Sequence, residues 1–93
     1  MARFTVNIFP QARRDLDRLS ADVGRRILRK IPELEQGPFS RGDTVKILQG
    51  FDPPMVRLRI GDYRVVYRIQ VAEVVILRVI HRGELFRALR DRV

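Results

Sequence analysis

The chain has 93 residues, enough for one small domain, and its apolar fraction of 45% is ordinary for a globular protein. It contains no cysteine, which excludes disulfides and thiolate metal sites, and no window approaches the roughly 20 apolar residues of a membrane span. The net charge of +8 is carried almost entirely by arginine, whose planar fork binds phosphate through two hydrogen bonds. We therefore expect residues 1–93 to form a single soluble, cytoplasmic domain without a signal peptide.

The first third of the chain predicts a strand followed by two helices. Residues 3–9 alternate apolar and polar side chains, as in a strand, and Pro10 suits the first turn of the helix that follows. Ser20 is a suitable N-cap for a second helix. An apolar stripe with helical spacing runs through Val23, Ile27, Ile31 and Leu34. Pro32 lies inside this stripe and should kink or shorten the helix.

The rest of the chain predicts strands. After a loop at 37–44 we expect a strand at 45–49, a hairpin up to about residue 70, a strand at 73–80 and a short basic helix at 83–92. The fold class is therefore α+β: a curved antiparallel sheet with the N-terminal helical hairpin on one face and a short C-terminal helix.

The hairpin can be paired from the sequence alone. Gly61-Asp62 is a two-residue turn signal between alternating runs, so Ile60 should face Tyr63 and Arg59 should face Arg64. Alternation then directs the tyrosines to the core and gathers basic side chains on the opposite face, namely Arg57, Arg59, Arg64 and Arg68. Like charges that face each other across strands are destabilising. The pattern indicates a surface that binds phosphate. The simpler alternative is a charged face that is only solvated.

Positive charge is concentrated on the strands. Residues 45–82 hold seven basic side chains, including Lys46, against three acidic ones, whereas the helical segment 11–36 is nearly balanced. We expect the helix arginines to be solvated or paired with acidic residues of that segment, namely Asp15, Asp17 and Glu33.

Few other chemistries fit the sequence. One histidine and no cysteine leave only scattered carboxylates for a metal, so we predict neither a metal site nor a cofactor. His81 and Arg82 end the last strand, where His81 could transfer a proton near neutral pH. Phe86 follows one helical turn later and could stack on a base or belong to the core. An enzyme built from these residues would act by arginine electrostatics on a phosphodiester.

Three segments carry a resemblance to a known family: PQARRDLDRL, LRIGDYRVVYRI and VVILRVIHRGELFR. Together with the order of elements, they resemble the RelE/ParE superfamily of bacterial toxins, and in particular its RelE branch. The resemblance covers essentially the whole chain. It implies a metal-independent endoribonuclease that cleaves mRNA in the ribosomal A site next to 16S rRNA, using the 2′-hydroxyl of the RNA as nucleophile. It also implies a cognate, RelB-like antitoxin that wraps the toxin in a hetero-oligomer.

By position, the resemblance implies that Arg64 stabilises the scissile phosphate, that Arg57 matches a strand lysine or arginine, and that Arg82 assists the leaving group. His81 is common in the branch. The predicted catalytic residues are thus Arg57, Arg64, His81 and Arg82, and the predicted RNA-binding residues are Lys46, Arg59, Arg68 and Phe86.

The chain departs from the family at two positions. Met55 stands where some members have a basic residue proposed as general base, and Phe86 stands where many have a tyrosine that stacks on the RNA. The departures leave open a ParE-like inhibitor of DNA gyrase without nuclease activity, and an inactive RNA-binding relic. The retained arginines favour the nuclease.

Overall fold

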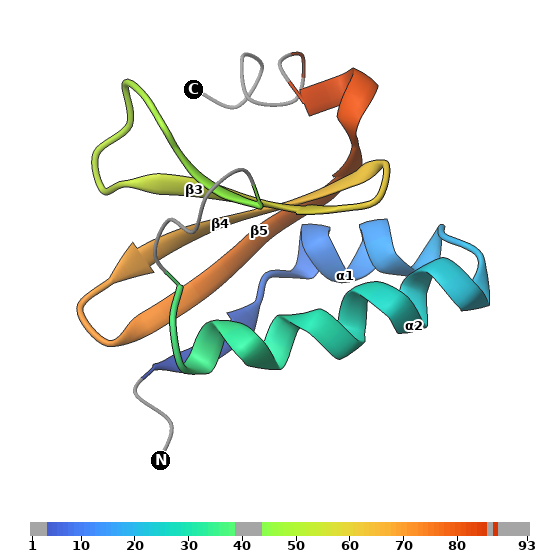
Figure 1. Ribbon diagram of the computed structural model, residues 1–93, viewed down its shortest axis with the longest axis horizontal. Coiled ribbons are helices and arrows are strands. Elements are labelled where there is room, and N and C mark those ends of the chain that lie inside the picture. Colours follow the sequence, from blue (N-terminus) through green and yellow to red (C-terminus); the bar gives the residue numbers. More distant parts are fainter. Residues whose placement is uncertain (1–3, 39–43, 86, 88–93) are drawn as a thin grey trace.

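The computed structural model describes residues 4–38, 44–85 and 87 (Figure 1). In chain order the elements are β1 (Thr5–Ile8), α1 (Pro10–Asp17), α2 (Ala21–Lys30), the 3-10 helix η1 (Ile31–Glu35), β2 (Val45–Leu48), β3 (Met55–Ile60), β4 (Tyr63–Gln70), β5 (Glu73–His81) and the 3-10 helix η2 (Arg82–Glu84). The predicted order of elements and the α+β class are confirmed. The predicted terminal helix at 83–92 lies largely outside the described residues.

The strands form one five-stranded sheet in the order β1-β5-β4-β3-β2. Strands β2, β3, β4 and β5 form an antiparallel run. At the edge of the sheet, β1 runs parallel to β5, with Thr5 opposite Glu73. The sheet is therefore mixed, and the prediction of an all-antiparallel sheet was wrong for β1. Parallel strands need a long crossover. The helical stretch from α1 to η1 connects β1 to β2 at the opposite edge of the sheet, and β1 and β5 are separated in the chain by these helices and by β2, β3 and β4.

The boundaries of the helices follow their sequence signals. Pro10 is the first residue of α1, and the Ser20 hydroxyl accepts a hydrogen bond from the backbone N–H of Val23 at 3.3 Å, as an N-cap does. The chain changes from α-helix to the tighter η1 just before Pro32, which has no N–H to continue α2. The expected shortening of the second helix at Pro32 is confirmed.

The hairpin of β3 and β4 has the predicted register: Ile60 pairs with Tyr63, Arg59 with Arg64, and Arg57 with Val66. Gly61 in the turn has a φ of 59°, a left-handed conformation that glycine adopts without steric cost. A two-residue turn and strict alternation therefore fix which side chains share each face of the hairpin.

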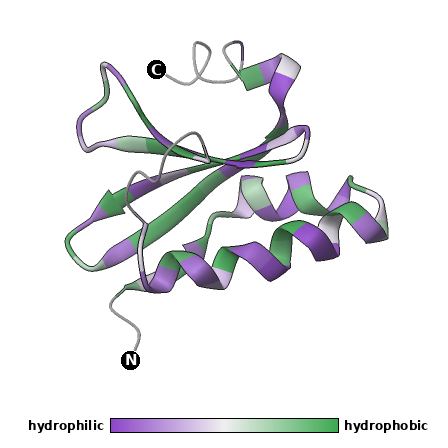
Figure 2. Ribbon diagram, in the orientation of Figure 1, coloured by the Kyte–Doolittle hydropathy of each residue, from purple (hydrophilic) through white to green (hydrophobic). Residues whose placement is uncertain are grey.

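The sheet has a core on each face. On the helix side, residues of α1, α2, η1 and the strands pack around Tyr67, which is fully buried and donates its hydroxyl hydrogen to the Pro38 carbonyl at 2.7 Å. In Figure 1 both helices lie on this side, and apolar and polar residues alternate along the helices and strands in Figure 2. The opposite face holds a smaller cluster made of Met55, Val66, Ile80 and Leu85. The predicted basic surface therefore surrounds a small apolar floor.

Candidate functional site

Four arginines from three parts of the chain gather beside the β3–β4 turn. Arg57 and Arg59 come from β3, Arg64 comes from β4, and Arg82 directly follows β5. Partial burial, and then the positive charges of Arg57, Arg59 and Arg82, lower the pKa of the Arg64 guanidinium, while the carboxylate of Asp62 opposes the change. We call these four residues the arginine cluster. Their mutual repulsion makes the cluster a favourable place for an anion to bind.

Backbone carbonyls hold Arg64 in the centre of the cluster. Its Nη1 donates hydrogen bonds to the carbonyl oxygen of Gly61 at 3.1 Å and to the carbonyl oxygen of Tyr63 at 2.9 Å. These two bonds occupy one terminal nitrogen and fix the guanidinium against the turn. The remaining N–H groups of an arginine held in this way can still donate to a phosphate.

Arg82 joins the cluster through the hairpin turn. Its backbone N–H donates to the Asp62 carbonyl at 2.8 Å, and its Nε lies 3.7 Å from a carboxylate oxygen of Asp62. The two side chains are 64% and 67% exposed, so this ion pair contributes little to stability. The backbone bond, which ties the end of β5 to the turn, is what places Arg82 near Arg64.

His81 is the last residue of β5 and the N-cap of η2. Its Nδ1 accepts a hydrogen bond from the Gly83 N–H at 3.1 Å, and its ring meets Tyr63 edge-on, with the ring centroids 5.5 Å apart. With Nδ1 acting as acceptor, the neutral imidazole carries its proton on Nε2. The exposed His81 side chain therefore has a donor group next to Arg82.

The other predicted contacts lie around the cluster or beyond it. Lys46 pairs with Arg57 across β2 and β3, which puts it on the same face. Arg68 is on this face too but lies four residues along β4 from Arg64, about 13 Å away at 3.3 Å per residue. Its Nε is buried and, within the described residues, has no hydrogen-bond partner. Phe86, the predicted stacking residue, lies outside the described residues.

Met55 belongs to the apolar floor under the cluster. Its side chain is 4% exposed and packs with Val66, Ile80 and Leu85. The position where some family members have a basic residue is here occupied by a buried thioether, which cannot accept a proton. The structure thus places no proton acceptor at residue 55.

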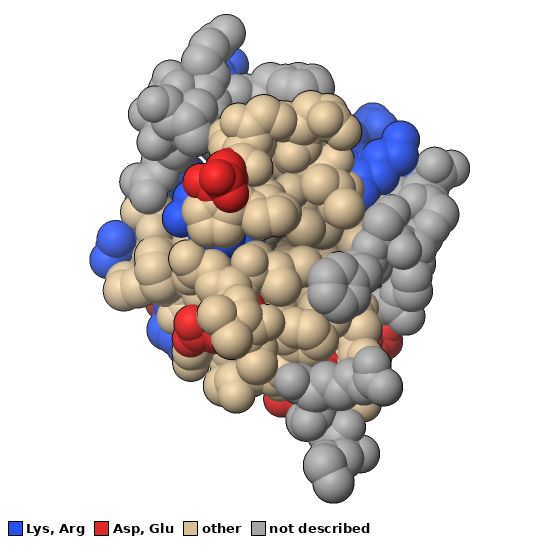
Figure 3. Space-filling model, turned by 90° about the vertical axis from the view of Figure 1, so that its left-hand side faces the viewer, with Lys and Arg blue, Asp and Glu red and all other residues tan. Residues whose placement is uncertain are grey.

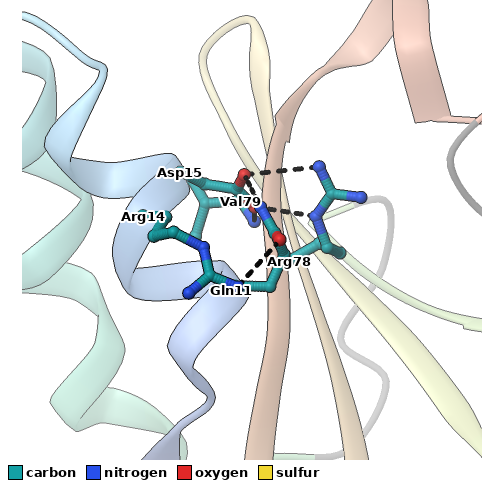
Figure 4. Close-up of polar contacts among 5 residues, drawn as sticks. All are labelled: Gln11, Arg14, Asp15, Arg78 and Val79. Carbon is teal, nitrogen blue, oxygen red and sulfur yellow. Dashed lines mark hydrogen bonds and ion pairs between the residues drawn. The ribbon is translucent and has the colours of Figure 1, made fainter.

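The prediction for Asp15 was wrong. Asp15 does not pair with a helix arginine; its carboxylate binds Arg78 of β5, with Arg78 Nε 2.9 Å from Oδ2, and also accepts the Val79 N–H at 2.8 Å (Figure 4). One signal in the sequence could have shown its burial, because Asp15 shares the inward-facing spacing of Ala12 and Leu16 on α1. Nothing local pointed to Arg78, which follows Asp15 by 63 positions.

The charge is unevenly distributed over the surface. In Figure 3 the described surface at the end of the molecule opposite the β3–β4 turn is mostly uncharged but carries some acidic side chains, and basic side chains lie at its margins. Among the residues described, no three His, Asp or Glu side chains come close enough to hold a metal ion. In the same part of the chain, no helix is long and apolar enough to cross a membrane.

The sequence and the fold are similar to those of known proteins. The model of the ParE toxin family of type II toxin–antitoxin systems matches residues 6–86. A chain of the archaeal RelE–RelB complex from Pyrococcus horikoshii is 32% identical, with a TM-score of 0.74, over 87% of this chain and 97% of that one. A chain of the RelBE2 toxin–antitoxin complex from Mycobacterium tuberculosis is also 32% identical, with a TM-score of 0.72, over 86% of this chain and 99% of that one.

A chain of the chromosomal ParDE system from P. aeruginosa shares the fold, with a TM-score of 0.58, 16% identity, and coverage of 85% of this chain and 96% of that one. No protein of curated function matches the sequence. The family match over residues 6–86 and the two relatives at 32% identity establish the family. The chain belongs to the RelE/ParE superfamily of type II toxin–antitoxin toxins, and to its RelE-like branch.

Proposed function

We propose that this toxin is an endoribonuclease that cleaves ribosome-bound mRNA without a metal ion and thereby inhibits translation. The observation that carries the proposal is the arginine cluster, in which Arg64 is held by two backbone carbonyls and its pKa is lowered by partial burial and by three other arginines. Concentrated positive charge at a partly buried point stabilises the negative charge that builds up on a phosphate during cleavage.

In the proposed reaction the 2′-hydroxyl oxygen of the RNA attacks the adjacent phosphorus. The new O2′–P bond forms as the P–O5′ bond breaks, which leaves a cyclic phosphate and a 5′-hydroxyl. Arg64 and Arg57 donate to the phosphate oxygens, and Arg82 stabilises the departing 5′-oxygen. The Nε2–H of His81 donates a hydrogen bond to that oxygen, which takes a proton from water, while the 2′-hydroxyl proton passes to water.

Around this centre we propose a wider RNA-binding surface. Arg59 is exposed beside the cluster and Lys46 is exposed across the strands from Arg57, so both can reach neighbouring phosphates. Arg68 on the same face and Phe86 beyond β5 are proposed to contact nucleotides farther along the RNA. On the ribosome, the excess positive charge would also face the phosphates of 16S rRNA.

We also propose a cognate antitoxin as the protein partner. The relative from P. horikoshii is a chain of a RelE–RelB complex, and the relative from M. tuberculosis is a chain of the toxin–antitoxin complex RelBE2. An acidic antitoxin segment that covered the arginine cluster would neutralise it and exclude RNA from it. The partner would thus inhibit the toxin by occupying its phosphate site.

The test is a reconstituted translation reaction with one mRNA, in which cleavage is mapped by primer extension. Wild-type toxin should cut the mRNA only when ribosomes are present, whereas Arg64→Ala should leave it intact. A toxin that stops translation with intact mRNA would contradict the proposal.

A second candidate function follows from the match of residues 6–86 to the ParE toxin family of parDE systems. A ParE-like toxin would inhibit DNA gyrase through protein contact and would not need the arginine cluster for catalysis. Supercoiling by purified gyrase in the presence of the toxin distinguishes the two. Inhibition that persists in Arg64→Ala, with no mRNA cleavage by the wild type, would favour the gyrase target.

A further inference from the structure

Arg26 of α2 lies against the hairpin turn that carries the arginine cluster. A Cβ atom built on Gly61 would lie 3.1 Å from each terminal nitrogen of Arg26 and 3.3 Å from its Cζ. The guanidinium therefore covers the space that a side chain at residue 61 would occupy. This contact brings an arginine from the helix layer to the tip of β3 and β4.

Unlike Arg25 and Lys30 on the same helix, Arg26 has no acidic partner within the described residues. Arg25 pairs with Asp22 at 2.7 Å and Lys30 pairs with Glu33 at 3.6 Å, both three residues apart on the helix. Within the described part of the chain, the Arg26 side chain has neither a hydrogen bond nor an ion pair. Its five N–H donors are therefore available to a ligand at the turn.

The same glycine also anchors the centre of the cluster. Arg64 Nη1 donates to the Gly61 carbonyl oxygen at 3.1 Å, so the guanidinium of Arg26 lies beside the residue that holds the guanidinium of Arg64. Arg59 faces Arg64 next to this turn and is exposed. Positive charge thus continues from the strand face across the turn to the helix. Asp62 is the only acidic residue among the described contacts of the turn.

We propose that Arg26 is a phosphate-binding residue, which extends the RNA-binding surface across the β3–β4 turn onto α2. It would bind the backbone of a nucleotide that flanks the scissile phosphate. The proposal rests on the proposed function, because it takes single-stranded RNA as the ligand. An acidic protein segment is the other anion that could meet these donors, and the experiment distinguishes the two.

The test measures the affinity of purified toxin for a short single-stranded RNA at several salt concentrations. The RNA carries 2′-O-methyl groups, so it binds without being cleaved. Each lost phosphate contact on a single strand reduces the slope of log K against log salt by about 0.7. We expect that reduction in Arg26→Gln, with an unchanged melting temperature, and a retained slope in Arg26→Lys, which keeps the charge.

Arg25→Gln is the matched control, because it removes the same charge from the next residue of the helix but from a side chain already paired with Asp22. It should keep the wild-type slope. The role of Arg26 would be overturned by an unchanged slope in Arg26→Gln or by an equal reduction of the slope in Arg25→Gln. It would also be overturned if Arg26→Lys reduced both the slope and the melting temperature.

Two further outcomes are informative. If Arg26→Gln weakens binding to a polyglutamate peptide but leaves the RNA slope unchanged, Arg26 contacts an acidic protein and the proposal is wrong. A wild-type slope near zero would remove the RNA ligand, and with it both this role and the nuclease. A normal wild-type slope that is unaffected by Arg26→Gln removes only the role of Arg26.

Discussion

Asp15 of α1 and Arg78 of β5 form an ion pair at the edge of the sheet where β1 has ended. Strand β1 pairs with β5 only as far as Ile76, and beyond it the Asp15 carboxylate accepts both the Arg78 Nε, at 2.9 Å, and the Val79 N–H, at 2.8 Å. An unpaired backbone N–H at a buried sheet edge is costly. The side chain of Asp15, which is 6% exposed, thus accepts the hydrogen bond that a neighbouring strand would otherwise accept. It also joins α1 to the segment that leads to His81 and Arg82.

We predict that Asp15→Asn destabilises the protein by about 3 kcal/mol, because it leaves the guanidinium of a largely buried ion pair without its counter-charge. Burial alone would raise the pKa of Asp15, but the hydrogen bonds from Arg78, Val79 and Gln11 outweigh burial and lower it. The folded-state pKa is thus below the unfolded-state pKa. The contribution of Asp15 is present above the unfolded pKa and is lost as the pH falls through the folded one.

Urea unfolding of wild type and Asp15→Asn from pH 7 to pH 2.5 tests this prediction. The difference between their unfolding free energies should be largest near neutral pH and should shrink as the pH falls below about 4. Asp17→Asn, which removes a neighbouring exposed carboxylate, is the control and should change stability little. A difference that stays constant over this range would mean that the charge of Asp15 is not what stabilises the fold.

Arg64→Ala should lower the rate of mRNA cleavage by about 100-fold or more, the usual effect of removing one donor to a transition-state oxyanion. Stability should change little, because the lost hydrogen bonds to the turn are offset by relief of repulsion from the other arginines. Single-turnover cleavage and a thermal melt measure the two effects. Arg14→Ala, which removes an exposed arginine from α1, controls for net charge. Wild-type cleavage by Arg64→Ala would rule out a role for this guanidinium.

The affinity for single-stranded RNA should depend strongly on salt. If about four basic side chains neutralise phosphates, the slope of log K against log salt should be near −3, at about −0.7 per contact. Fluorescence anisotropy with a labelled, 2′-O-methylated RNA between 50 and about 300 mM salt would measure it. A slope near zero would leave the arginine cluster without a nucleic-acid role and would direct attention to a protein target.

Two substitutions separate the two roles of His81. His81→Asn keeps a side-chain acceptor for the Gly83 N–H but removes the Nε2 donor, whereas His81→Ala removes both. We expect the asparagine variant to keep the wild-type melting temperature and to lose cleavage. The alanine variant should lose cleavage and also about 1 kcal/mol of stability, as for a missing N-cap. Full cleavage by the asparagine variant would assign His81 to capping alone.

The sequence by itself determined the local arrangement. Alternation with a period of two, together with Gly61 in a left-handed turn, fixes which residues face each other, so the register of β3 and β4 and the shared face of Arg59 and Arg64 were predictable. The N-cap at Ser20 and the end of α2 before Pro32 were predictable for the same reason. In each case the cause lies within a few residues of its effect.

The tertiary structure decided what depends on the path of the chain between distant segments. The parallel pairing of β1 with β5 brings together the first and last strands of the chain, and that pairing ends where Asp15 can meet Arg78, 63 positions away. The bond from Arg82 to the Asp62 carbonyl, and the contact of Arg26 with Gly61, likewise join elements that no periodicity relates. A residue pattern fixes the face on which a side chain lies, whereas the docking of helices and strand ends fixes its neighbours. Hence the strand arginines could be predicted from sequence, but the complete arginine cluster could be seen only in the fold.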